Sequence, residues 1–575
     1  MIDGASGAAA QTRGAPAISP TNFEGLSDDD NIDLTTWSTW PADSQLAVGP
    51  DHVFEVVNIV GRIYDKNGNT LDSFALIDFF DVPDGYIDFD PKVIYDAFTG
   101  RWFASYVSIF DDELGPDEAL LHVAISQTSD PTDAWNLYTQ PYEDVFPDYP
   151  GIGITNDKFT ISADLYDIDG PPGFIGPGCQ PEVGFCGQET IVIEKADVVA
   201  GLPAVSVDIA YFDPALRETV RPAHSLSPIN DQYLVTFSTS APDLLTMLRV
   251  TGTPSEGNVT EFIAANLTIL PQEVPPPSIT AGDADCIIFT ENLGPPPCIE
   301  SSDRRALEAI WRNDRLWLGA SAACLPPGDE TTRSCAHLIE LNTSGAPSVV
   351  QDIMYGAPGN YYSFPALRTD AAGNLYVVVA HTNPSIFAEA RVTGRLAGDP
   401  PNTLADSALL RAGEVVHDSG RWGDYLGAAV DPSQPLCVWV VGQFAKDTEG
   451  ADWGTQIAAL SYSGACGGAP PPPTDTPTPT NPPPTATPTR TSTPQPTATR
   501  TRTPTATPSP LFGDVSCNET VDSIDAALIL QYGADLLSRL ACPESADVNQ
   551  DGSINSIDAA LVLQYVAGLL PRLPP

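Results

Sequence analysis

The sequence predicts a mainly β protein, in which a large β-propeller is followed by a disordered Thr/Pro-rich linker and a small α-helical domain. Over most of the chain, short runs rich in Val, Ile, Phe and Tyr alternate with turns rich in Gly, Asn, Asp and Pro, as strands and their connections do. The composition then changes twice, first to Pro and Thr and then to Leu-rich repeats. We therefore expect an N-terminal extension at 1–39, the propeller at 40–466, the linker at 467–510 and the helical domain at 511–575.

The propeller prediction rests on repeated pairs of strands. In each repeat a short apolar strand follows a loop marked by Pro or Asp, and a more apolar strand follows a turn. Units of this kind, at spacings of roughly 45 to 85 residues, begin near Leu46, Asp90, Asp148, Arg221, Arg304, Ser363 and Arg421. Four-stranded blades around an axis fit this length better than a β-sandwich, which would end far earlier. Seven blades are favoured, and six or eight are alternatives. The one helical pattern of this region spans Ser302–Trp311.

The linker is composed mainly of Pro and Thr. Proline fixes φ and removes a backbone donor, so this stretch should be extended, polyproline-like and without a core. We expect it to act as a spacer, and its Thr/Pro density also suits O-glycosylation.

The ten cysteines indicate an oxidising compartment. They form close sequential pairs, which favours disulfides over a zinc site and leaves the connectivity open: Cys179/Cys186, Cys286/Cys298, Cys324/Cys335, Cys437/Cys466 and Cys517/Cys542. We predict a secreted, extracellular protein, with attachment to the cell surface as an open alternative. No apolar run is long enough to span a membrane. Residues 1–20 lack the apolar core of a signal peptide, so we expect the true N-terminus to have been trimmed or misassigned.

The net charge of −49, from 26 Lys+Arg against 75 Asp+Glu, argues against some partners. A nucleic-acid-binding protein needs a basic face to neutralise phosphates. An anionic membrane surface would also repel this chain. We therefore expect no nucleic-acid partner, whereas excess carboxylate suits solubility and divalent cations.

The C-terminal domain is an internal duplication with an offset of 33 residues. Asp514-Val515 corresponds to Asp547-Val548, and the run SIDAAL at 523–528 recurs at 556–561. Each half opens with a twelve-position loop of oxygen-bearing residues and continues with a helical pattern. Such loops bind Ca²⁺, a hard cation that takes six to eight oxygen ligands. The sequence therefore predicts two calcium sites.

The two predicted sites are unequal. The ligands of the second loop would be Asp547, Asn549, Asp551, the Ser553 carbonyl, Asn555 and Asp558, with Gly552 at the sharp turn. The first loop offers Asp514, Ser516, Asn518, the Thr520 carbonyl, Asp522 and Asp525. Glu519 replaces the turn glycine there, so a residue with a Cβ must adopt a conformation that glycine adopts easily. We expect calcium to bind the first loop less tightly than the second; polar turns that bind nothing are the alternative.

This module, with one helix after each loop, resembles a type I dockerin over residues 513–573. The resemblance implies docking to a cohesin-type domain on a scaffold or cell surface, through loop positions 10 and 11. Carried over, these positions are Ser523 and Ile524 in one half and Ser556 and Ile557 in the other. Because the halves are near copies, either could bind the partner. Glu519 and the lack of a basic residue soon after each pair depart from the usual pattern.

The β region resembles a family of large secreted bacterial propellers with sialidase-like architecture. The segments that carry the resemblance are SQTSDPTDAWNLY (126–138), FPDYPGIGI (146–154), FPALRTDAAGNLY (364–376) and RWGDYLGAAVDP (421–432). The resemblance implies the fold and no particular chemistry.

The chemistry of the propeller stays open. G-x-S-x-G, HExxH and P-loop motifs are absent, and the six histidines show no ligand spacing, so we expect them at turns or on the surface. Asp90, Asp148 and Asp424 stand where loops enter blades, near Arg101, Arg395 or Arg421. Two such carboxylates across a pocket could hydrolyse a glycoside. An aspartate in such a loop more commonly caps a turn or pairs with an arginine. Tyr149, Trp422 and Tyr425 could stack on sugars, although large aromatics of propellers more often belong to the core.

Two functions follow. In the first, the dockerin-like module locates a propeller that recognises polysaccharide or a surface ligand. In the second, the propeller is a glycoside hydrolase of polysaccharide catabolism, with its active site in the propeller. Whether the chain is an enzyme is left open by the sequence.

Overall fold

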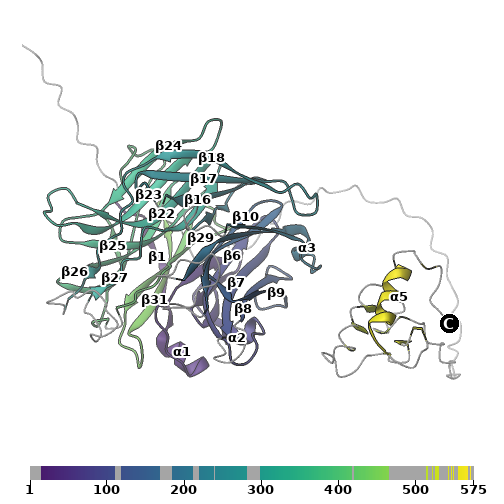
Figure 1. The fold of residues 1–575 in the computed structure, drawn as a ribbon. Helices are drawn as coiled ribbons and strands as arrows, with labels where there is room; N and C mark the ends of the chain where they lie inside the picture. The colour runs from purple at the N-terminus through teal and green to yellow at the C-terminus, as the bar shows by residue number, and fades with distance from the viewer. Residues whose placement is uncertain are drawn as a thin grey trace, which may run out of the picture. The chain divides into compact units, whose positions relative to one another are not determined.

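The chain forms two compact units, residues 1–475 and 476–575, and each is described by itself. The computed structural model describes most of the first unit and scattered residues of the second (Figure 1). The described residues are 14–110, 118–168, 184–211, 219–238, 240–281, 298–417, 420–464 and 466 in the first unit, and 513, 515, 521, 525–526, 528–529, 532, 542, 545–546, 548–549, 554–566 and 570 in the second. The predicted linker therefore lies outside the described residues.

The first unit is built almost entirely of antiparallel sheets, and those of its described part include five of four strands each. Three of them use consecutive strands: β2 (Gln45–Val48), β3 (His52–Val57), β4 (Val60–Asp65) and β5 (Thr70–Ala75); β6 (Ile87–Asp96), β7 (Arg101–Phe110), β8 (Glu118–Ser126) and β9 (Trp135–Glu143); β25 (Tyr361–Thr369), β26 (Leu375–Asn383), β27 (Ile386–Arg395) and β28 (Ala408–Arg411). A fourth contains β14 (Arg221–Pro222), β16 (Gln232–Phe237), β17 (Leu244–Thr251) and β18 (Thr260–Thr268). The fifth has the order β1 (Ala17–Ser27), β31 (Trp453–Ser461), β30 (Val438–Ala445), β29 (Gly427–Val430).

A larger sheet joins two further groups of four antiparallel strands. The first group is β10 (Val145–Ile154), β11 (Lys158–Asp167), β12 (Phe185–Glu194) and β13 (Ser206–Tyr211), and the second is β21 (Ala306–Arg312), β22 (Arg315–Cys324), β23 (Arg333–Asn342) and β24 (Ser348–Tyr355). The two-residue strand β15 (His224–Ser225) pairs in parallel with β10 and with β21 and so bridges the groups. A separate pair is formed by β19 (Ser278–Ile279) and β20 (Cys298–Ile299).

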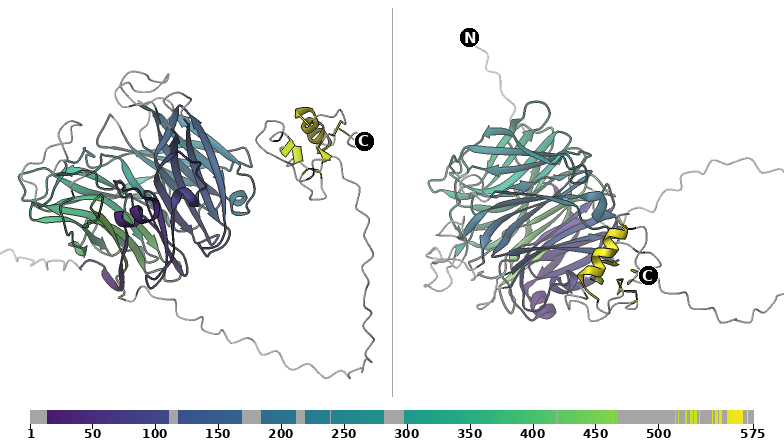
Figure 2. Two further views of the ribbon diagram at one scale, coloured as in Figure 1. Left: turned by 90° about the horizontal axis from the view of Figure 1, so that it is seen from below. Right: turned by 45° about the vertical axis from the view of Figure 1, so that its right-hand side comes forward.

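The sheets have a propeller-like arrangement (Figures 1 and 2). One strand of each four-stranded group contacts its counterpart in the next group, in the order β2, β6, β10, β14, β21, β25 and β29, and β29 contacts β2 again. The ring of inner strands is thus closed. The mainly β, propeller-like fold predicted from the strand repeats is confirmed.

The ring is closed by strands from opposite ends of the unit. β1 pairs antiparallel with β31, from Ala17 opposite Ser461 to Ser27 opposite Gly454. The prediction of a separate N-terminal extension at 1–39 is wrong for β1, because these residues complete the last sheet. The chain then enters the helix α1 (Asp28–Thr35), where the backbone N–H of Ser27 donates to Asp30 Oδ2 (2.9 Å) as an N-terminal cap.

Three inner strands share an unusual bulge. The register of β6, β10 and β25 shifts around Asp90-Pro91, Tyr149-Pro150 and Phe364-Pro365. The residue before each proline has a positive φ, 57°, 53° and 53° respectively, which is sterically costly for residues with a Cβ. Bulges re-aim side chains at the rims of sheets, and at the bulge of β10 the backbone N–H of Tyr149 donates to Asp90 Oδ2 (3.0 Å).

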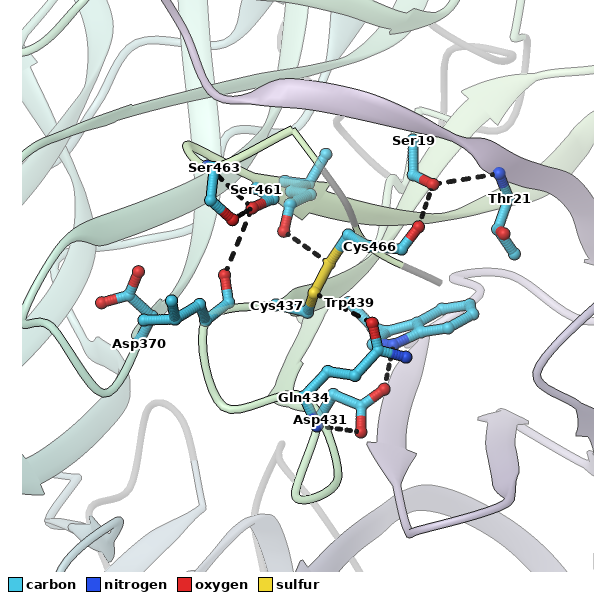
Figure 3. Close-up of a disulfide and its surroundings, with 12 residues drawn as sticks. Ser19, Thr21, Asp370, Asp431, Gln434, Cys437, Trp439, Ser461, Ser463 and Cys466 are labelled. Atoms are coloured by element: carbon cyan, nitrogen blue, oxygen red, sulfur yellow. Dashed lines mark hydrogen bonds between the residues drawn. A yellow bond between two sulfur atoms is a disulfide. The ribbon is translucent and has the colours of Figure 1, made fainter. Parts of the chain in front are cut away.

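Disulfides join neighbouring strands and loops of the first unit, as expected from the sequence pairs. Cys324 bonds Cys335 across β22 and β23, and Cys437 bonds Cys466. Figure 3 shows the second disulfide beside Ser19 of β1, whose hydroxyl donates to the Cys466 carbonyl. Cys186, Cys298 and Cys542 are also disulfide-bonded; their predicted partners Cys179, Cys286 and Cys517 lie outside the described residues.

Two local predictions are wrong. The segment Ser302–Trp311, with its helical pattern, leads into the strand β21. The helices of the first unit's described part are α1, α2 (Leu76–Phe79) and α3 (Lys195–Val199). Four of the histidines are buried rather than at turns or on the surface: His122, His337, His381 and His417. No helix in the described part of the chain is long and apolar enough to cross a membrane.

Candidate functional site

Buried carboxyl groups gather where inner strands of different sheets begin. Asp43 and Asp90 are 1% and 5% exposed. Asn58 links them, because its side-chain N–H donates to Asp43 Oδ2 (2.9 Å) while its Oδ1 accepts the backbone N–H of Asp90 (2.8 Å). Asp43 Oδ1 accepts the backbone N–H of Asp424 (2.7 Å). Burial and the nearby Asp424 and Asp90 raise the pKa of Asp43 well above its usual range.

Two stacked tyrosines lie against this carboxyl cluster. The rings of Tyr149 and Tyr425 stack with centroids 4.8 Å apart, and both side chains are buried. Asp90 Oδ2 accepts the backbone N–H of Tyr149 (3.0 Å) and the hydroxyl of Tyr425 (3.3 Å). The guanidinium groups of Arg221 and Arg305 lie 4.3 and 4.4 Å from the Tyr149 ring. We call this set, together with Asp43 and Asp164, the axial cluster.

The three predicted aspartates differ in their surroundings, and of these Asp90 belongs to the axial cluster. Asp424 pairs with Arg421 (3.2 Å), as expected, whereas Arg101 and Arg395 bond backbone carbonyls instead of these carboxylates. Burial and Asp90 raise the pKa of Asp148 to about 8, so this carboxyl holds its proton near neutral pH. Tyr149, Trp422 and Tyr425 are 4%, 1% and 2% exposed. They therefore belong to the core, and their rings are not open to a sugar.

The stability of the first unit should fall as the pH rises through the titration of Asp164. This carboxyl is 2% exposed, accepts the Thr219 hydroxyl and lies 3.7 Å from Arg305, and burial raises its pKa to about 6. A folded pKa above the unfolded value means that the protonated form stabilises the fold below about pH 4 and that this stabilisation is lost by about pH 6. Between these values we expect Asp164 to contribute a loss of about 1 to 3 kcal/mol.

Denaturant unfolding of the wild type and of Asp164→Asn at pH values from 4 to 7 measures this contribution. The substitution keeps an oxygen for the Thr219 hydroxyl but cannot titrate. A wild-type curve parallel to that of the variant would contradict the assignment.

In the second unit, corresponding aspartates of the two halves hold the loop backbone. Asp525 and Asp558, at position 12 of each loop, are fully buried. Asp525 Oδ1 accepts the backbone N–H of Val515 (3.0 Å), and Asp558 Oδ1 accepts that of Val548 (2.9 Å). The two bonds are related by the 33-residue offset of the sequence repeat. In the second loop, Asp558 also accepts the backbone N–H of Asn549 (3.2 Å) and of Asn555 (3.0 Å).

These loops are closed onto a small apolar core that both halves share. The helix α5 (Ser556–Val566) follows the second loop and places Ala559 and Val562 in this core. The other buried members are Val515, Ala526, Ile529, Ala546 and Val548. Each loop is thus tied to the core by its second position and by the carboxylate of its last.

Residues 512–567 match the dockerin type I domain. Domains of this type bind calcium, their presence implies a cohesin partner, and the proteins that bear them are typically extracellular. The resemblance read from the duplicated loops is thereby confirmed. No curated protein matches the chain.

Solved structures resemble the first unit only distantly. A protein of unknown function from Dyadobacter fermentans is 11% identical, with a TM-score of 0.34, over 66% of this chain and 96% of that one. The Hadza microbial sialidase Hz136 is 12% identical, with a TM-score of 0.32, over 73% of this chain and 65% of that one. The GH93 α-L-arabinofuranosidase of Fusarium graminearum is 9% identical, with a TM-score of 0.32, over 67% of this chain and 96% of that one.

Among the residues predicted to contact the partner of the dockerin domain, Ile557 is exposed to solvent. It lies on α5 and is 56% exposed, although its backbone N–H is fixed by Asn555 Oδ1 (2.8 Å). Ser556 is the first residue of α5. Ser523 and Ile524 lie outside the described residues, as do the predicted ligands Asp514, Ser516, Asn518, Thr520, Asp522, Asp547, Asp551 and Ser553.

Proposed function

We propose that this protein is an extracellular carrier that docks through its dockerin domain to a cohesin-type partner and displays a seven-bladed propeller. The blade number counts the five four-stranded sheets and the two four-stranded groups of the large sheet. Docking is supported best by the match of residues 512–567 to the dockerin type I domain, and calcium binding by the matched pair of buried carboxylates, Asp525 and Asp558, at the ends of the duplicated loops.

The chemistry of these loops fits calcium. A fully buried carboxylate is costly unless a charge or several donors satisfy it, and Asp525 and Asp558 are both fully buried. Bound Ca²⁺ would place a positive charge against both carboxylates and would order oxygens from both loops. The residues that would hold it are the twelve predicted from the sequence, ending at Asp525 and Asp558, with the second site stronger because its turn has Gly552 where the first has Glu519.

Removing calcium should unfold the dockerin domain and leave the propeller intact. Because the loops would carry several mutually repelling carboxylates without the metal, their free energy of folding depends on its binding. We expect EDTA to abolish the far-UV helical signal of residues 511–575, and excess Ca²⁺ to restore it. An unchanged spectrum would contradict the calcium proposal.

Matched substitutions separate the two sites. Asp558→Ala should weaken calcium binding at the stronger site at least tenfold, whereas Asp525→Ala should mainly remove the weaker phase of the titration. Calorimetric titration of Ca²⁺ into each variant measures both phases. Equal effects of the two substitutions would argue against unequal sites.

We propose that the docking partner covers the start of α5, where Ile557 lies. The apolar side chain of Ile557 is 56% exposed and is available to pack against another protein. The proposed partner residues are Ser523, Ile524, Ser556 and Ile557.

For the propeller we propose recognition of polysaccharide or of a surface ligand. The alternative is a glycoside hydrolase, in which a protonated carboxyl acts as general acid; burial and the neighbouring Asp90 raise the pKa of Asp148 to about 8, as that role requires. The burial of Tyr149, Trp422 and Tyr425 weakens this alternative. Assaying the full chain against a glycan panel, for binding and for hydrolysis, decides between the two.

A further inference from the structure

Two adjoining cavities follow the axial cluster along the ring of inner strands. The inner cavity, of about 40 Å³, is lined by Lys92, Arg221 and Glu308 among others. The outer cavity, of about 190 Å³, is lined by Arg312 and by residues of β2 and β29. Ile94, His224 and Arg368 line both cavities, so these side chains form the boundary between them.

Cations outnumber carboxylates along both cavities. The lining side chains include Lys92, Arg221, Arg312 and Arg368, but the carboxylates are Glu308 and Asp431 alone. Both carboxylates are already paired, Glu308 with Arg368 and Asp431 with the buried Lys66 (2.6 Å). Such an excess is unexpected in a chain of net charge −49.

Three of these cations, and the neighbouring His224, have hydrogen-bonding capacity to spare. Within the described part of the chain, Arg221 Nη2, Arg312 Nε, Arg368 Nε and His224 Nδ1 are buried and have no hydrogen-bond partner. Arg221 and Arg368 are 3% and 6% exposed, and a buried donor without a partner costs free energy. Gly151 keeps the space that Arg221 occupies, because any Cβ there would collide with the guanidinium.

The outer cavity is lined by apolar side chains as well as by these cations. Tyr95, Phe98, Leu226 and Pro435 line it, and Phe98 remains 44% exposed. A ligand that satisfies both parts has a compact apolar body and one anionic group. A volume of about 190 Å³ is sufficient for a single ring and too small for an oligosaccharide.

We propose that the outer axial cavity binds a small organic carboxylate, with its anionic group between Arg312, Arg368 and His224 and its apolar body against Phe98 and Tyr95. This site is independent of calcium binding and of the docking surface. Lys92 and Arg221 extend the positive potential inward from it, through the inner cavity.

The test uses the full chain and titration calorimetry with benzoate, whose ring matches the walls, and with neutral benzyl alcohol. We expect benzoate to bind saturably, with a Kd on the order of 1 mM or tighter, and benzyl alcohol to bind at least tenfold more weakly. Absence of benzoate binding, or equal binding of the alcohol, would overturn the proposal.

Variants locate the site. Arg312→Met should weaken benzoate binding at least tenfold, and Phe98→Ala about fivefold, each at an unchanged melting temperature. The control is Arg315→Met, at the other end of the same turn, which does not line the cavity and is paired loosely with Glu340 (3.8 Å); its affinity should stay within twofold of the wild type. Benzoate binding that survives both Arg312→Met and Phe98→Ala would place the ligand elsewhere and refute the assignment.

Two further ligands test whether the carboxylate alone, or the charge alone, is sufficient for binding. Glucuronate carries the carboxylate on a polar sugar, and chloride offers charge without an apolar body. Binding of either as tightly as benzoate, with the same loss in Arg312→Met, would overturn the organic, apolar part of the proposal.

Discussion

Deleting residues 1–27 should prevent the first unit from folding cooperatively, with a loss of about 5 kcal/mol or more, which is comparable to the whole stability of an ordinary domain. The deletion removes β1 and exposes the hydrogen-bonding edge of β31, and unpaired edges promote aggregation. It also removes Leu26, which is fully buried. The buried Glu55 would lose the backbone N–H of Leu26 as a donor (3.0 Å).

Thermal and denaturant unfolding with size-exclusion chromatography measure this effect. The matched control lacks residues 476–575, which form the separate compact unit, and its first unit should melt as in the full chain. If the chain without residues 1–27 melts cooperatively within a few degrees of the wild type, β1 does not close the ring.

The sequence predicted the individual sheets, but it did not predict that β1 completes the last sheet and closes the ring. Strand periodicity and turn residues are local signals, and they indicated the repeated pairs from Leu46 onward. β1 has the sequence AISPTNFEGLS, with a proline inside it and little apolar alternation. Its strand state depends on pairing with β31, over 400 residues away, and no local pattern reports that pairing.

Ser302–Trp311 and the histidines illustrate the same limit. The residues of β21 have a spacing that suits a helix, but pairing with β22 and β15 imposes the extended state. His337 and His381 were expected near the surface. Within the sheets they are satisfied by Asp352 (2.6 Å) and Glu389 (2.8 Å), acceptors that come from neighbouring strands of the same sheet.

The two candidate sites differ in how far sequence could reveal them. The duplicated loop module is contiguous in sequence, so its spacing was sufficient to predict the dockerin type I domain that matches residues 512–567. The axial cluster instead joins Asp43, Asp90, Arg221 and Arg305 from different sheets. The sequence singled out Asp90 among these but associated the aspartates with Arg101, Arg395 or Arg421, of which Arg421 does pair with Asp424. A clue was present in the repeated X-Pro pairs at the strand starts, which turn out to be bulges with positive φ.

Replacing Lys66 by methionine should destabilise the first unit by about 3 to 5 kcal/mol, because it leaves a buried charge without its partner. Lys66 Nζ lies 2.6 Å from Asp431 Oδ2, and the two side chains are 2% and 0% exposed. Asp431 would keep the Trp439 indole N–H (3.1 Å), seen in Figure 3, and the Ser433 hydroxyl (2.8 Å). Those neutral donors stabilise a carboxylate less than an ammonium group does.

A double variant and a surface control make this prediction specific. Lys66→Met/Asp431→Asn removes both charges and should recover at least half of the loss, since the cost arises from the uncompensated carboxylate rather than from the missing attraction. Arg411→Met breaks the exposed pair with Glu414 (2.7 Å, 36% and 42% exposed) and should cost less than about 1 kcal/mol. Denaturant unfolding of the three variants measures the ranking. Equal losses in the single and double variants would mean that packing of the lysine stem, and not its charge, stabilises the contact between these sheets.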